Sequence, residues 1–116
     1  MILSNPSTNR MEIPGGWSEI KPATDEVQGI CSVMKSNVED ITKTSYRKFR
    51  AIIFRDQIVA GTNYLARVYT GEEKMIDLMV WEHLPQRTSE GLWTSEFQLM
   101  GIKPNRKLED PLEPFN

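Results

Sequence analysis

Apolar residues recur at steps of three and four between residues 24 and 42, and this spacing predicts one long amphipathic helix. The positions on its apolar face are Val27, Ile30, Cys31, Met34, Val38 and Ile41. Asp25 and Glu26 fall in the first turn, where carboxylates interact favourably with the positive end of the helix dipole. The preceding segment, "MEIPGGWSEIKPAT", contains two prolines and a glycine pair, so we expect it to be extended.

After residue 42 the period of the apolar pattern changes to two, which is typical of β-strands. Four segments are expected to be strands: residues 45–55, 62–70, 75–83 and 92–100. In the first, alternation places Phe49, Ala51 and Ile53 on one face of the sheet. Ile52 and Phe54 fall on the other face. The corresponding sets in the second and third strands are Tyr64, Ala66 and Val68, and Ile76, Leu78 and Val80.

The connections between these strands are short, which makes consecutive strands antiparallel neighbours. The sequence therefore predicts an α+β fold, in which one long helix packs across an antiparallel β-sheet of four to five strands. Residues 1–10 are rich in Asn, Ser, Thr and Pro and show no periodicity, so we interpret them as a flexible N-terminal extension. Residues 11–116 would form a single domain, as the length of 116 residues suggests.

Composition and charge exclude several classes of partner. Apolar residues make up 39% of the chain and charged residues 26%, which is typical of a globular protein. The formal net charge of −2 gives no reason to expect binding to nucleic acid or to an anionic membrane, because both require a basic face. No stretch approaches the roughly 20 apolar residues that span a bilayer. The single cysteine and the polar N-terminus favour a cytoplasmic location.

The candidate catalytic residues do not form a recognisable site. Cys31 lies on the apolar helix face, and His83, the only histidine, lies at a predicted strand end. These two residues cannot supply the ligands of a zinc site, and no glycine-rich phosphate loop is present. Arginines on the strands, Arg67 among them, are expected to face solvent for the most part. We therefore expect no enzymatic activity, no metal and no cofactor.

The link between the first two predicted strands has an unusual composition. In "DQIVAGTNY", Ile58, Val59 and Ala60 precede Gly61, where turns usually carry polar residues. One explanation is that Ile58 or Val59 folds back under the sheet while Gly61 supplies a positive φ. The other is an exposed binding surface. The connection after the third strand also opens with apolar residues, Leu84–Pro85, and the parity of a meander places it at the same end of the sheet.

Three segments carry a resemblance to a known family. In their order along the chain, "IPGGWSEIKPATDEVQGI", "QIVAGTNY" and "HLP" resemble the stefins, or type 1 cystatins, and the resemblance extends over about residues 11–115. The Gln-x-Val-x-Gly core, formed by Gln57, Val59 and Gly61, is weak by itself. Together with Pro-Gly-Gly, Thr-Asn-Tyr, Leu-Pro and the lack of disulfides, it becomes specific.

The resemblance implies a cystatin-like fold and a tight, reversible inhibitor of papain-like cysteine proteases such as cathepsins L, B and H. It implies that an N-terminal segment and two hairpin loops block the active-site cleft. The residues implied to bind the protease are Pro14, Gly15, Gly16, Gln57, Ile58, Val59, Ala60, Gly61, Leu84, Pro85 and Gln86. The active form would be a monomer, and a domain-swapped dimer that exchanges the helix and first strand would not inhibit. The alternative is a cystatin-like protein-interaction module without protease inhibition.

Overall fold

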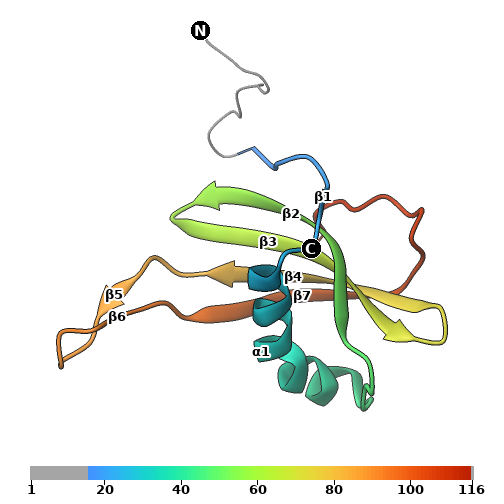
Figure 1. Ribbon diagram of the computed structural model, residues 1–116, viewed down its shortest axis with the longest axis horizontal. Helices are drawn as coiled ribbons and strands as arrows, with labels where there is room; N and C mark the ends of the chain where they lie inside the picture. The colour runs from blue at the N-terminus through green and yellow to red at the C-terminus, as the bar shows by residue number, and fades with distance from the viewer. Residues whose placement is uncertain (1–15, 116) are drawn as a thin grey trace, which may run out of the picture.

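A helix lies across an antiparallel sheet in the computed structural model, which describes residues 16–115 (Figure 1). The strand order is β1-β2-β3-β4-β7. The bounds are β1 (Lys21–Pro22), α1 (Asp25–Thr42), β2 (Arg50–Val59), β3 (Gly61–Gly71), β4 (Lys74–Glu82) and β7 (Phe97–Arg106). A separate hairpin pairs β5 (Gln86–Arg87) with β6 (Trp93–Thr94). The predicted α+β class is confirmed. The predicted boundary between the extension 1–10 and the domain lies outside the described residues.

Local signals define both ends of α1. The Thr24 side chain accepts a hydrogen bond from the Val27 N–H at 3.2 Å, which caps the first turn. Lys43 adopts a left-handed conformation with φ 57° and ends the helix. Five of the six predicted apolar-face residues are buried: Val27, Ile30, Cys31, Met34 and Val38. The sixth prediction is wrong, because Ile41 is exposed. It lies beside Leu99 and Met100 of the outermost strand β7, so the sheet covers only part of its side chain.

The core lies between α1 and one face of the sheet. The strands contribute Ala51, Phe54, Tyr64, Ala66, Val68, Ile76, Leu78 and Val80. The predicted faces of β3 and β4 are confirmed, but those of β2 are wrong, since Ala51 and Phe54 are buried together in this core. The pairing of β2 with β3 shifts between Ala51 and Ile53, so one extra residue is inserted and the alternation changes phase.

The C-terminal segment covers the opposite face of the sheet. Leu112 from this segment is buried, as are Leu65 and Arg67 of β3. The Arg67 guanidinium donates two hydrogen bonds to Asp77, at 2.7 and 2.8 Å. It also donates to the main-chain carbonyls of Lys107, Leu108, Asp110 and Pro111. The expectation that Arg67 faces solvent is therefore wrong, because main-chain carbonyls of the segment after β7 surround its guanidinium. Figure 1 shows the chain turning back after β7.

The last strand of the sheet begins later than predicted and continues further. Residues 92–100 were expected to form it, whereas β7 covers Phe97–Arg106 and residues 93–94 belong to the separate hairpin. Pro104 lies within β7. This is possible because β7 is an edge strand that pairs only with β4, and a proline there need not donate to a second neighbour.

Candidate functional site

The β2–β3 turn is tighter than the sequence suggested. Val59 pairs with Gly61, so the two strands continue to the tip and Ala60 alone lies between them. Gly61 has φ +97°, a conformation that favours glycine. Ile58 and Val59 are therefore the last residues of a strand rather than members of a loose loop.

The end of β4 packs directly against this turn. Thr62 pairs with Glu82, and the Trp81 indole N–H donates a hydrogen bond to the Ala60 carbonyl at 2.9 Å. A Cβ atom placed on Gly61 would lie only 2.1 Å from the Glu82 carbonyl oxygen. This contact fixes the turn against β4, and Leu84 follows Glu82 by two residues. The segment that begins with Leu84–Pro85 therefore leaves the sheet at the same end as the turn.

The N-terminal segment reaches this end as well. Trp17 forms an isolated antiparallel bridge with Gln57, and the Ser18 N–H donates to the Asp56 carbonyl at 2.7 Å. Gly16, directly before Trp17, is exposed. Figure 1 shows this segment running beside β2. Of the N-terminal residues predicted to bind, Pro14 and Gly15 lie outside the described residues.

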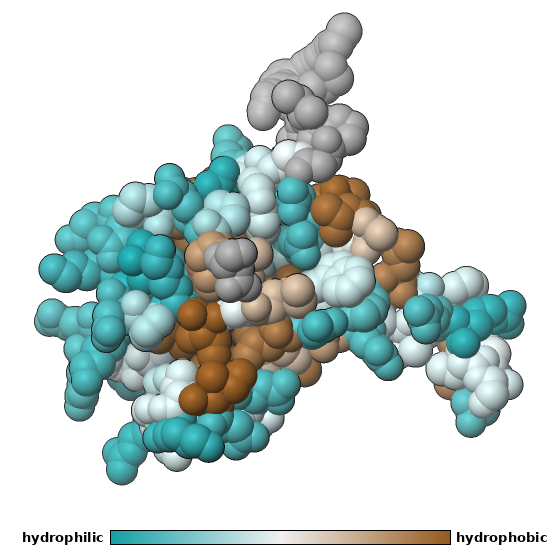
Figure 2. Space-filling view, turned by 180° about the vertical axis from the view of Figure 1, so that it is seen from behind, coloured by the Kyte–Doolittle hydropathy of each residue, from teal (hydrophilic) through white to brown (hydrophobic). Residues whose placement is uncertain are grey.

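We call residues 57–61 and 84–86 the rim. Its large apolar side chains point into solvent, with exposed fractions of 63% for Ile58, 40% for Val59 and 57% for Leu84. Ala60, Pro85 and Gln86 are also exposed. The explanation that Ile58 or Val59 folds back under the sheet is therefore wrong. Figure 2 shows hydrophobic side chains on the surface near the end of the sheet where the turn lies.

Polar and aromatic contacts hold the base of the rim. The Asn63 side-chain amide donates to the Gln57 side-chain oxygen at 2.8 Å, and the Tyr64 hydroxyl donates to Glu82 at 3.1 Å. Burial, together with the nearby Glu82 carboxylate, raises the pKa of Tyr64, so this hydroxyl keeps its proton at neutral pH. The His83 ring stacks on Trp81 with 3.9 Å between the ring centroids. The rim is therefore a preformed surface rather than a loose pair of loops.

Trp17 and Trp81 shape the rim but were absent from the predicted set. Alternation along its strand places Trp81 on the sheet face opposite Val80, and no local signal in the sequence links it to Ala60. The two residues are brought together by the register of β3 against β4, in which Asn63 pairs with Trp81. A tryptophan near a turn, with one N–H to satisfy, was the only available hint.

The rim carries no arrangement suited to catalysis. Cys31 is buried in the core between α1 and the sheet, whereas His83 stacks on Trp81 beside the rim. Within residues 16–115, no group of three or more His, Cys, Asp or Glu side chains is placed to hold a metal ion. The helix in this part of the chain also lacks the combination of length and apolar character that crossing a membrane requires.

We expect the Cys31 thiol to be unreactive in the folded protein. Burial raises its pKa to about 12, so the nucleophilic thiolate is scarce at pH 8. A thiol-specific disulfide reagent should react at least about 100-fold faster in denaturant than with the native protein. Absorbance of the released thiolate measures both rates. Fast reaction of the native protein would contradict the buried position of Cys31.

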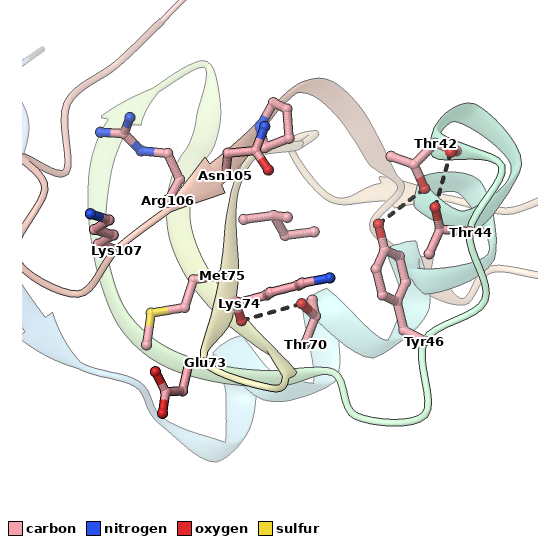
Figure 3. A pocket seen from close by; sticks show the side chains of 12 residues that line it. Thr42, Thr44, Tyr46, Thr70, Glu73, Lys74, Met75, Asn105, Arg106 and Lys107 are labelled. Atoms are coloured by element: carbon pink, nitrogen blue, oxygen red, sulfur yellow. Dashed lines mark hydrogen bonds between the residues drawn. The ribbon is translucent and has the colours of Figure 1, made fainter.

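A cavity of about 590 Å³ lies at the other end of the sheet, between the end of α1, the β3–β4 turn and the end of β7 (Figure 3). Its four hydroxyl groups, those of Thr42, Thr44, Tyr46 and Thr70, already donate to acceptors of the protein. These acceptors are the carbonyls of Val38, Thr42 and Lys74 and the Thr42 hydroxyl oxygen. The cavity therefore offers no hydroxyl donor to a ligand, and the rim remains the stronger candidate.

Comparison with known proteins identifies the family to which the chain is similar. The family described as "Cystatin domain" matches residues 15–100. The chain is 37% identical to Cystatin-A8 of Sus scrofa over 103 residues, which is 89% of this chain and 94% of the relative. It is 37% identical to Cystatin-A of Homo sapiens over 103 residues, 89% and 99% of the two chains. It is 36% identical to Cystatin-B of Macaca fuscata fuscata over 101 residues, 87% and 97%.

Proposed function

Since the chain belongs to the cystatin family, we propose that it is a tight-binding, reversible inhibitor of papain-like cysteine proteases of the cathepsin L, B and H type. The observation that carries this proposal is the rim itself. Its apolar side chains are exposed, gathered at one end of the sheet and held rigidly, although a monomer has no structural reason to keep such a surface.

The rim is suited to filling a groove on another protein. Burial of one large apolar side chain contributes about 1.5–3 kcal/mol, and the rim offers Ile58, Val59 and Leu84 together. Nanomolar affinity corresponds to about −12 kcal/mol. Because the turn is already fixed by Trp81 and Gly61, little conformational entropy is lost on binding. Most of the free energy from burying the apolar side chains would therefore contribute to affinity.

The proposed roles follow the order of the elements. Ile58, Val59 and Ala60 would lie across the catalytic centre of the protease, with Gln57, Gly61 and the turn backbone forming hydrogen bonds. Leu84, Pro85 and Gln86 would pack on the leaving-group side of the cleft. Pro14, Gly15 and Gly16 would enter the opposite side. The chain would present no scissile bond to the protease thiolate, so it would block the cleft without being turned over as a substrate. The proposal assigns the chain no catalytic role and no cofactor.

We assign inhibition to the monomer, in which the β2–β3 turn is folded back on itself. A dimer that exchanged α1 and β2 between two chains would straighten this turn and remove the rim. A cytoplasmic site of action is part of the same proposal. It is supported by the presence of one cysteine, which is buried in the core.

Val59→Asp tests the proposed function at the β2–β3 turn, the part of the rim proposed to lie across the catalytic centre. In an assay with papain or a cathepsin, the wild-type protein should inhibit in the nanomolar range. The variant should raise the inhibition constant by about 100-fold or more, because a carboxylate would be buried in an apolar cleft without a partner. Val33→Asp is the matched control, since Val33 is exposed on the outer face of α1 and should leave inhibition unchanged. Full papain activity in a stoichiometric excess of folded wild-type protein would favour the interaction module without protease inhibition.

A further inference from the structure

The Arg55 side chain of β2 links the N-terminal segment to the C-terminal segment. Its Nε–H donates to the Ser18 carbonyl at 2.8 Å, and its Nη1 donates to the Leu112 carbonyl at 2.9 Å. One guanidinium thus joins three parts of the protein that are far apart in the chain. Figure 1 shows the segment after β7, in red, reaching the N-terminal segment, in blue.

Strand pairing between the N-terminal segment and β2 is interrupted beside Arg55. The isolated bridge at Trp17 is separated from the two-residue strand β1, which begins at Lys21. In this interval the Ser18 carbonyl accepts from Arg55, while the Asp56 N–H donates to the Ser18 hydroxyl at 3.0 Å. Two side chains therefore supply the hydrogen bonds that main-chain groups supply in a continuous ladder.

Both acceptors of Arg55 belong to well-packed parts of the protein. Ser18 and Leu112 are buried, and four further carbonyls of the C-terminal segment accept from Arg67. The Arg55 side chain is itself only partly exposed. Hydrogen bonds from a charged donor are stronger than neutral ones, and their loss leaves buried carbonyls without a donor. The position of Ser18 therefore depends on how the opposite end of the chain is docked.

We propose that Arg55 is a positioning residue for protease inhibition, through which the docked C-terminal segment holds the N-terminal part of the binding surface in place. This inference rests on the proposed function. Residues 14–16, which are proposed to enter the protease cleft, join the described fold at Trp17, directly before Ser18. Because both the N–H and the carbonyl of Ser18 are bonded, this junction is already ordered before the protease binds.

Arg55→Met tests the positioning role by inhibition kinetics. The variant should raise the inhibition constant for papain by about tenfold, mainly through faster dissociation, because it loses both hydrogen bonds and keeps the aliphatic part of the side chain. Arg50→Met is the matched control. Arg50 is exposed at the other end of β2, so this variant should leave the constant unchanged. Circular dichroism verifies that both variants are folded.

A double-mutant cycle separates positioning from a general loss of stability. Gly16→Glu places a carboxylate in the N-terminal contact and should weaken inhibition by itself. Since Arg55 acts through this same contact, Arg55→Met should add less than about twofold in the Gly16→Glu background. A purely structural role would make the two effects multiply. A further loss of about tenfold in that background would therefore overturn the positioning role.

Amide hydrogen exchange of the free protein gives a second readout that requires no protease. The internal reference is the Ala23 amide, which donates to the Ile52 carbonyl beyond the interruption. In Arg55→Met, and also in Leu112→Ala, the Ser18 amide should exchange at least about tenfold faster relative to this reference. Leu112→Ala keeps the carbonyl but removes the buried side chain that anchors the C-terminal segment.

The outcomes separate this inference from the proposed function. An unchanged inhibition constant for Arg55→Met, with wild-type inhibition intact, would overturn the positioning role and leave the proposed function standing. Faster Ser18 exchange in Arg55→Met but not in Leu112→Ala would overturn the part assigned to the C-terminal segment. Failure of the wild-type protein to inhibit papain would overturn both proposals.

Discussion

Gly61→Ala should lower the free energy of unfolding by about 2–4 kcal/mol and weaken protease inhibition by at least about 100-fold. Two physical effects add at this position. The backbone at φ +97° is strained for any residue with a Cβ atom, at a cost of about 1–2 kcal/mol. The new Cβ would also lie 2.1 Å from the Glu82 carbonyl oxygen, so β4 and the turn must separate. Separation would move Ala60 away from Trp81 and displace Ile58 and Val59 from the rim.

Gly71→Ala is the matched control for this prediction. Gly71 has nearly the same conformation, φ +98°, but its nearest neighbouring atom, from the Lys48 side chain, lies 3.9 Å from the added Cβ. It should therefore show the backbone cost alone, about 1–2 kcal/mol, with inhibition intact because it lies at the other end of β3. Urea unfolding and inhibition constants measure both variants. Equal effects of the two substitutions on stability and inhibition would contradict the close approach of the turn to β4.

Arg67→Met should lower the free energy of unfolding by about 3 kcal/mol, without a direct effect on the rim. The substitution leaves the Asp77 carboxylate buried after the loss of two hydrogen bonds. It also removes the donor to four carbonyls of the C-terminal segment. Arg106, whose Nε lies 3.3 Å from Asp77, remains as a counter-charge. We therefore expect the lower end of the range of about 3–5 kcal/mol for breaking a buried pair.

A surface ion pair provides the contrast. Lys21→Met removes the partner of Asp56 at 3.2 Å, where both side chains are partly exposed, and should cost at most about 1 kcal/mol. The double variant Arg67→Met/Asp77→Leu should recover part of the Arg67→Met loss, since it removes both buried charges. Urea unfolding of the three variants at constant ionic strength makes the comparison. A loss for Arg67→Met no larger than that for Lys21→Met would show that the C-terminal segment does not depend on Arg67.

The position of the rim residues could be predicted from the sequence, but their exposure could not. Leu84, Pro85 and the run Ile58–Ala60 could be placed at one end by the parity of a meander, because the connections between consecutive strands are short. Their exposure could not be derived from composition. It depends on the tight closure at Gly61 and on the bond from Trp81 to Ala60, which joins residues that are far apart in the chain.

By itself, the sequence determined the helix and the strand faces that depend on interactions between residues close together in the chain. The helix Asp25–Thr42 follows from its apolar spacing and its cap, and the faces of β3 and β4 follow from alternation. Only the tertiary structure decided the phase change in β2, the burial of Arg67 and the hairpin that carries Trp93. In each of these, the outcome depends on a neighbour that the linear pattern does not contain: the pairing partner of β2, the returning C-terminal segment, and the resumed pairing beyond Pro85. Long-range contacts of this kind are set by packing and hydrogen bonding in the folded chain, and not by the preferences of the residues involved.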